Sequence, residues 1–407
     1  MRVVVYPHTM EVGGSQLNAL EIAAAVRERG HEVLLYAPEG DLLAHAHSLG
    51  LEHVPALRAP FHPSPTVTRD LARLVHDRGI DVLHGYEWPP ALEAFGVRAL
   101  RPHVAAVATV MSMAIPPFLP SSMPLVVGTR RLAEQARRSR RGPVRLLEPP
   151  VDTHANRPGV AADRFRADHP VEPGTAQVVV VSRLAHELKL EGILTAVRAV
   201  ATLARGRAVR LVVVGDGPAA PEVRAAAEEV NRAAGREVVL LTGQLDDPRG
   251  AYDAADVCLG MGGSALRALA FARPLVVQGE RGFFELLTPE SVGTFLEQGW
   301  YGVADRAPEE AVEHLAALLV GLLDDPGRRE RLGCYGRELV EERFGLGRAA
   351  ELQIEVYREA VEARAGVART LAEGARSTTA VVRHKARRRV QRSRGDVARD
   401  DFNAKPA

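Results

Sequence analysis

The stretch Val178-Val-Val-Val-Ser-Arg-Leu-Ala-His-Glu-Leu-Lys189 joins an apolar run to two cations. The run of β-branched residues predicts a buried strand, and a helix is expected from Leu190 on. Lysine is rare here: 3 of the 52 basic residues are Lys, and Lys189 is the only one before Lys385. One interpretation is an ordinary exposed lysine. The other is that Arg183 and Lys189 hold a diphosphate, since a cation at a strand end and another at a helix start suit an anion.

Strand and helix patterns alternate on both sides of this stretch. Short apolar runs separated by helical stretches predict parallel strands with crossover helices. The expected strands are 3–6, 33–37, 81–84 and 104–110, then 178–182, 210–214, 238–242, 257–260 and 274–278. Residues 149–174 carry prolines and glycines typical of a linker. The sequence therefore predicts an α/β protein with two doubly wound, Rossmann-like domains, 1–165 and 166–345, that face a central cleft.

Composition is that of an ordinary globular protein, with 46% hydrophobic and 25% charged residues. No apolar run is long enough to span a membrane, and the N-terminal strand pattern does not resemble a signal segment. Cys258 and Cys334 lack metal-ligand spacing, so both are interpreted as reduced packing residues of a cytoplasmic protein. No cluster of His, Asp or Cys has metal spacing either, and neither a metal nor another cofactor is expected.

Charge is concentrated at the C-terminal end. Residues 376–407 hold 10 Lys/Arg and 3 Asp/Glu, a balance of +7, which leaves −6 on the rest of a chain of net charge +1. Residues 374–407 are therefore expected to form a basic tail, disordered or weakly helical. Three interpretations stay open for it: a solvated end, contact with anionic lipid at the inner membrane face, or nonspecific nucleic-acid contact. The acidic body argues against nucleic acid as a partner.

Three glycine-bearing turns follow expected strands. Each would present bare backbone N–H groups or let a ligand approach the backbone closely. They are Gly13-Gly14-Ser15, Gly215-Asp216-Gly217-Pro218 and Gly260-Met-Gly262-Gly263-Ser264. Such turns are routine in α/β proteins, and only their common position after strands, together with Arg183 and Lys189, favours a phosphate-binding site.

These segments together resemble the family 4 glycosyltransferases of the GT-B architecture. The matching stretches are Gly13-Gly14, Asp81-Val-Leu-His84, Pro150-Val-Asp152, Ser182 to Lys189, Gly215 to Pro218, Tyr252 to Val257 and Ala265 to Val277. The resemblance implies that Arg183 and Lys189 grip the diphosphate of a nucleotide-sugar donor and act as catalytic residues. It also implies donor contacts at Gly13, Gly14, Gly215, Asp216, Gly217, Gly262, Gly263, Ser264, Ala265 and Leu266. A helix over 346–373 would cross back onto the first domain.

The chain departs from the family where paired glutamates are usual. Arg267 stands in place of the second glutamate, and the loop before it is shortened to Gly260–Ser264. Arg267 is a candidate phosphate contact, because its guanidinium suits bidentate anion binding. Glu285, after another glycine turn, is a candidate replacement for a lost donor contact.

Residues 84–88 supply candidates for the acceptor side. His84 ends an expected strand, and Tyr86, Glu87 and Trp88 follow it. Trp88 could stack on a sugar, and Glu87 could accept a hydroxyl proton. The alternative is an ordinary strand–loop transition with an aromatic plug.

The resemblance implies a retaining, metal-independent transferase of hexosyltransferase type. It would move a sugar from a nucleotide donor to a carbohydrate, lipid-linked or natural-product acceptor. Two alternatives stay open: a non-catalytic or partner-dependent nucleotide-sugar binding protein, and a nucleotide-sugar epimerase on the same fold.

Overall fold

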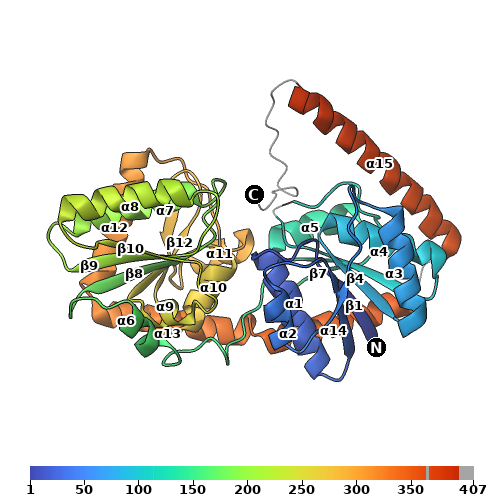
Figure 1. Cartoon of the computed structure of the whole chain (residues 1–407), viewed down its shortest axis with the longest axis horizontal. Coiled ribbons are helices and arrows are strands. Elements are labelled where there is room, and N and C mark those ends of the chain that lie inside the picture. Colours follow the sequence, from blue (N-terminus) through green and yellow to red (C-terminus); the bar gives the residue numbers. More distant parts are fainter. Residues whose placement is uncertain (113, 364–365, 394–407) are drawn as a thin grey trace. The chain divides into compact units, whose positions relative to one another are not determined.

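The chain divides into two compact units (Figure 1). The computed structural model describes residues 1–112, 114–363 and 366–393. Unit 1 comprises Met1–Glu148 and the described residues from Leu346 on, and unit 2 comprises Pro149–Gly345. The division at Pro149 differs from the expected boundary at residue 166, because the helix α6 (Ala162–Asp168) buries Ala162 and Phe165 in a core of unit 2.

Unit 1 is built on a seven-stranded parallel sheet with the strand order β3-β2-β1-β4-β5-β6-β7. The central strands are almost wholly buried, as expected for a parallel sheet covered on both faces. The strands are β1 (Arg2–Tyr6), β2 (Glu32–Ala37), β3 (Glu52–Pro55), β4 (Val82–Tyr86), β5 (Ala105–Val110), β6 (Leu125–Val127) and β7 (Val144–Leu146).

Helices cover both faces of this sheet (Figure 1). The helices of unit 1 are α1 (Gly14–Glu28), α2 (Leu43–Ser48), α3 (Pro65–Arg78), α4 (Trp88–Leu100), α5 (Arg130–Ser139), α14 (Leu346–Glu362) and α15 (Val367–Ser393). Helices α1, α2 and α14 share one apolar core with the sheet, and α3, α4, α5 and α15 share the other. Unit 1 is therefore completed by helices that come from the far end of the chain.

Unit 2 repeats this plan with a six-stranded sheet of order β10-β9-β8-β11-β12-β13, in which only β13 is antiparallel. Its strands are β8 (Ala176–Val181), β9 (Val209–Val214), β10 (Val239–Gly243), β11 (Val257–Gly260), β12 (Leu275–Gln278) and β13 (Phe284–Leu286). Its other helices are α7 (Leu190–Leu203), α8 (Ala220–Ala234), α9 (Arg249–Ala254), α10 (Gly263–Ala270), α11 (Val292–Gln298), α12 (Pro308–Leu323) and α13 (Pro326–Arg343). Helices α7, α8 and α12 pack on one face, and α6, α9, α10 and α13 on the other.

Of the two forms expected for the tail, disordered or weakly helical, the structure shows a helix over residues 374–393. These residues belong to α15, which lies beside α4 (Figure 1). The helix is anchored by Val381, which is 3% exposed, and by the carboxylate of Glu373, which accepts a hydrogen bond from Ser122 N and forms an ion pair with Arg141. A buried carboxylate holds the helix where the sequence shows few apolar anchors. Residues 394–407 of the expected tail lie outside the described residues.

Two further expectations can be compared with the fold. Cys258 is buried in β11, whereas Cys334 is exposed on α13 and is therefore not the packing residue that the sequence suggested. Among the described residues, none of the helices combines the length and the apolarity that crossing a membrane requires.

Candidate functional site

In unit 2, the predicted donor residues lie at the point where the strand order reverses. The chain passes from β8 to β9 and β10 on one side, and from β11 to β12 on the other. Loops after neighbouring parallel strands meet at one sheet edge, and ligands of open α/β sheets bind beyond that edge. The β8–α7 loop carries Arg183 and Lys189, the β9–α8 loop carries Gly215 to Gly217, and the β11–α10 loop carries Gly262.

Lys189 bridges two of these loops. It occupies the N-cap position of α7, and its ammonium Nζ donates to the Met261 sulfur Sδ at 2.9 Å. A thioether is a weak acceptor and carries no charge to balance the ammonium. Burial and the neighbouring charge of Arg183 lower the pKa of Lys189 to about 8. The site therefore holds a cation whose charge is not neutralised by its own surroundings.

Arg183 adds a second cation next to the first. Its side chain is exposed, and in the part of the chain that the structure describes no carboxylate forms an ion pair with either Arg183 or Lys189. Other arginines of this chain do have such partners, for example Arg207 with Asp324. Two like charges held together without an anion are unfavourable in the empty site and favour binding of a polyanion.

The β9–α8 turn is packed against the β8–α7 loop. Gly215 has φ +142°, and a Cβ there would lie 1.9 Å from the Ser182 carbonyl oxygen. Gly217 has φ +153°, and its Cβ would lie 2.4 Å from the Leu184 carbonyl oxygen. Leu184 N also donates to the Asp216 carbonyl at 2.9 Å. Only glycine fits at both positions, so the turn fixes the backbone that leads to Lys189.

The third loop brings a helix N-terminus to the same edge. Gly262 is the N-cap of α10 and has φ +57°, and Ser264 Oγ receives a hydrogen bond from Met261 N. Ala265 and Leu266 are wholly buried, so only their backbone could face a ligand. Arg267 is partly buried on the same helix. The first turn of α10 offers a positive dipole end beside Lys189.

Glu285 is not brought into this cluster by any contact described. It is the exposed middle residue of β13 and pairs with Val277 of β12. Its role as a donor contact stays a prediction.

Two features near Lys189 were not predicted from the sequence. Leu188, just before Lys189, has φ +66°, a backbone conformation that is costly for a branched side chain and clusters at functional sites. Glu191, in the first turn of α7, accepts hydrogen bonds from Arg281 N and Gly282 N at 3.1 and 2.8 Å. Residues near Glu191 in the sequence give no sign of this contact, because the turn that it holds lies about 90 residues away. Gly282 indicates only that a turn is present there.

Unit 1 has a corresponding reversal of strand order between β1 and β4. Gly13 and Gly14 follow β1 and begin α1, and Glu87 follows β4. Ser15 Oγ donates to Glu87 Oε1 at 3.3 Å and so links the two loops. The structure groups Gly13 and Gly14 with Glu87, and their contact with a donor stays a prediction.

Glu87 is the most constrained residue of this cluster. It is 7% exposed, has φ +65°, and accepts hydrogen bonds from Met111 N and Ser112 Oγ, each at 2.9 Å. Burial raises the pKa of the Glu87 carboxyl, and the bonds that it accepts oppose that rise. A strained, buried carboxyl that reaches three loops is a candidate general base or hydroxyl acceptor.

The two other acceptor-side candidates differ from each other. Trp88 is partly exposed at the start of α4, and its ring lies edge-on to Phe118 with centroids 5.2 Å apart. His84 is 0% exposed, with Nδ1 2.8 Å from the Tyr357 hydroxyl and Nε2 2.6 Å from Thr109 Oγ1. Burial lowers the pKa of His84 to about 3, so the ring is neutral at pH 7. This placement argues against direct contact of His84 with an acceptor.

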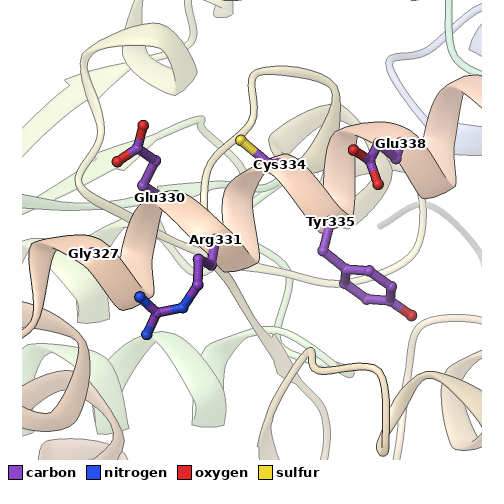
Figure 2. Close-up of a pocket in the computed structure, with 6 residues that line it drawn as sticks. All are labelled: Gly327, Glu330, Arg331, Cys334, Tyr335 and Glu338. Carbon is purple, nitrogen blue, oxygen red and sulfur yellow. The ribbon is translucent and has the colours of Figure 1, made fainter.

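A shallow pocket elsewhere does not coincide with these residues. Its lining consists of Gly327, Glu330, Arg331, Cys334, Tyr335 and Glu338, all from α13 (Figure 2). Because a single helix supplies every side chain, no groups converge on it from separate elements. Among the described residues, no group of three or more His, Cys, Asp or Glu side chains is placed to hold a metal ion.

Comparisons with known families match both units. Residues 13–148 match the glycosyl transferase 4-like domain, and residues 175–324 match the glycosyl transferases group 1 domain. The first match spans the unit 1 loops around Glu87, and the second spans Arg183, Lys189 and the three loops of unit 2.

Curated relatives are similar over part of the chain. A D-inositol 3-phosphate glycosyltransferase of Kineococcus radiotolerans is 32% identical over 242 residues, 54% of this chain and 52% of that protein. An alpha-D-kanosaminyltransferase of Streptomyces kanamyceticus is 28% identical over 222 residues, 51% of this chain and 50% of that protein. The chain thus spans about half the length of the curated relatives it matches.

Solved structures share the fold over most of the chain. A glycosyltransferase from Rickettsia africae superposes with a TM-score of 0.71 at 14% identity, covering 89% of this chain and 99% of that one. Anabaena HepE in complex with UDP-glucose superposes with a TM-score of 0.64 at 15% identity, covering 88% of this chain and 100% of that one. At these identities the likeness shows the fold.

Proposed function

Because this chain belongs to family 4 of the glycosyltransferases and has their GT-B fold, we propose that it moves a sugar from a nucleoside-diphosphate donor to an acceptor. The donor binds to unit 2 and the acceptor to unit 1. One observation carries the proposal: Arg183 and Lys189 lie together beyond β8 with no carboxylate partner among the described residues, and Lys189 has a lowered pKa.

The chemistry requires charge stabilisation on the departing diphosphate. As the bond from the sugar carbon to the phosphate oxygen breaks, negative charge grows on that oxygen. Arg183 can grip the diphosphate with its planar fork, and the Lys189 ammonium lies on a fixed helix N-cap. The α10 N-terminus supplies a further positive dipole. These groups supply without a metal the stabilisation that other transferases take from one.

In this proposal Glu87 orients the acceptor hydroxyl, and Trp88 stacks on the acceptor sugar. Retention of the anomeric configuration is proposed on family membership, with the donor phosphate itself taking the acceptor proton. Glu87 then orients the hydroxyl through a hydrogen bond. HepE, a structural neighbour, is described in complex with UDP-glucose, which supports a nucleotide sugar as donor.

The first experiment compares thermal stability of the protein with UDP, GDP, ADP and TDP and their common sugar adducts. A ligand at 100 times its dissociation constant adds about 2.7 kcal/mol to the free energy of unfolding. We expect the nucleotides of one base to raise the melting temperature of the wild type. Arg224→Ala, a control that removes an exposed arginine of α8, should show the same rise. Lys189→Ala should lose that shift and lower turnover by at least about a hundredfold. A Lys189→Ala protein that keeps a near-normal rate would remove the proposal.

A second candidate function has one observation in its favour. Arg267 lies on α10 where the family usually has a glutamate. This difference supports the second candidate function, in which the chain binds a nucleotide sugar without transferring it. NMR of the bound donor separates the cases. Sugar transfer needs added acceptor, epimerisation changes the donor alone, and a binding protein leaves the donor intact with every acceptor mixture.

A further inference from the structure

Helix α15 is held to unit 1 by one face only. Its buried residues recur at helical spacing, at Thr370, Glu373, Ser377 and Val381. Near its C-terminal end, Lys385 Nζ donates to the His62 carbonyl oxygen at 2.5 Å. The helix is therefore a fixed part of unit 1, and its opposite face points away from the sheet.

That opposite face carries an apolar stripe. Positions 368, 371, 375, 382 and 386 fall on one side of a helix and are Ala, Leu, Ala, Val and Ala, all exposed. Leu371 is 54% exposed and Val382 is 62% exposed. Thr379 fills the gap in the stripe, and its hydroxyl is already bonded to the Ala375 carbonyl at 2.9 Å. The stripe therefore presents little unsatisfied polarity.

Cations flank the stripe on both sides. Arg376, Arg383 and Arg387 recur at helical spacing on one flank, and Lys385 and Arg389 lie on the other, all with exposed side chains. None of the five forms an ion pair within the described part of the chain. Residues 367–393 contain 8 Lys/Arg and one acidic residue, Glu373, which is buried. The charged side chains on both flanks of the stripe are therefore all cations.

A neighbouring loop extends this surface. Because Lys385 contacts the His62 carbonyl, Phe61 lies next to α15, and its side chain is 59% exposed. Helix α5 adds exposed arginines at positions 130, 131, 137 and 138, and Arg141 beyond its end forms an ion pair with Glu373 of α15. An aromatic side chain and a second basic helix thus accompany the stripe.

We propose that the exposed face of α15, together with Phe61, binds the surface of an anionic lipid bilayer. A helix with an apolar centre and cationic flanks lies in the plane of the interface, with its apolar residues among the acyl chains and its cations at the headgroups. The helix has 27 residues but too many charges to cross the bilayer. Nucleic acid would leave the apolar stripe between the cations unused, so the bilayer accounts for more of the surface.

The packed face of α15 contacts the proposed acceptor side of unit 1. The ring of His384 on α15 lies 5.4 Å from the ring of Phe118, which in turn lies 5.2 Å from the ring of Trp88. Lipid binding by α15 itself needs neither donor nor acceptor. It can therefore be tested without reference to the proposed transfer reaction.

The test is co-sedimentation of the full chain with vesicles, one set of phosphatidylcholine alone and one with about a third of phosphatidylglycerol. Three proteins are compared with the wild type: the triple variant Arg376→Gln/Arg383→Gln/Arg387→Gln, the single variant Val382→Asp, and a matched control. The control, Arg205→Gln/Arg224→Gln/Arg232→Gln, removes three exposed arginines from unit 2. Circular dichroism and melting temperature establish that each variant is folded.

We expect the wild type and the control to sediment with the anionic vesicles only. The α15 triple variant should lower the partition coefficient by roughly a hundredfold, and Val382→Asp by roughly tenfold. Absence of binding to anionic vesicles would overturn the proposal, as would an equal loss in the unit 2 control, which would indicate diffuse charge. Unchanged binding by Val382→Asp would overturn the apolar contact. Preferential binding to duplex DNA of matched charge, lost in the α15 triple variant, would assign the surface to nucleic acid instead.

Discussion

The ammonium of Lys189 lies 2.9 Å from the thioether of Met261, across the point where the strand order of unit 2 reverses. The two residues come from loops that follow the neighbouring strands β8 and β11. A soft, uncharged sulfur fixes the position of the ammonium without neutralising it. The contact therefore keeps Lys189 ready for an anionic ligand.

The affinity for a nucleoside diphosphate should fall as the pH rises above about 8, the pKa of Lys189. Lysine carries its charge below its pKa, so the attraction for phosphate is present below that pH and is lost above it. Calorimetric titrations between pH 6.5 and 9.5 measure the effect. Lys189→Ala provides the baseline for ionisation of the ligand itself. Parallel pH profiles in the two proteins would show that Lys189 does not contact the phosphates.

Replacing Lys189 by methionine should stabilise the empty protein while it abolishes binding. The folded state lowers the pKa of Lys189 from 10.5 to about 8, so the charged form is disfavoured by folding. Below pH 8 this cost is fully present, and it disappears as the pH rises through 8 to 10.5, where the lysine is neutral in both states. We expect Lys189→Met to gain about 1 kcal/mol at pH 7 in urea unfolding. A variant less stable than the wild type would contradict this account.

Gly215→Ala should destabilise unit 2 by about 2–4 kcal/mol. The added Cβ would lie 1.9 Å from the Ser182 carbonyl oxygen, and φ +142° is strained for alanine. Gly206→Ala is the matched control, because a Cβ there meets nothing within 4 Å. Chemical unfolding of the two variants compares them, and equal stabilities would show that the turn relaxes without cost.

Glu87→Gln should lower turnover at least about tenfold and leave nucleotide affinity unchanged. The amide keeps the shape of the side chain, but its NH₂ group would face a hydrogen-bond donor such as Met111 N or Ser112 Oγ. Ser112→Ala is the matched control, because it removes one of these hydrogen bonds and leaves the carboxylate in place. Steady-state kinetics with a donor titration separate kcat from donor KM. Loss of donor affinity in Glu87→Gln would place Glu87 on the donor side instead.

Local patterns in the sequence were enough for the sheets and for the cationic pair. The apolar run of β8 and the cations after it are contiguous, so strand, loop and helix start can be inferred within twelve residues. Long-range contacts were not accessible in this way. Glu373 finds Ser122 some 251 residues earlier in the chain, and this contact turns an expected disordered segment into an anchored helix.

His84 illustrates the same limit at the candidate site. Its position at the end of a strand suggested exposure toward a ligand. Tyr357, 273 residues later, covers it and occupies one ring nitrogen. Glu87 was identified as a candidate from its place after β4, but neither its positive φ nor its bond to Met111 N could be inferred, because both depend on how β5 ends beside it.

The return of α14 to unit 1 has a consequence for the order in which the protein is made. Unit 2 is one uninterrupted segment, Pro149–Gly345, whereas unit 1 needs the residues from Leu346 on. On the ribosome, unit 2 can complete its core before synthesis ends. The hydrogen bond between His84 and Tyr357 in unit 1 can form only after Tyr357 has been synthesised. A chain that stops short of Leu346 would therefore have a complete unit 2 and a unit 1 whose sheet lacks part of its helical cover on one face.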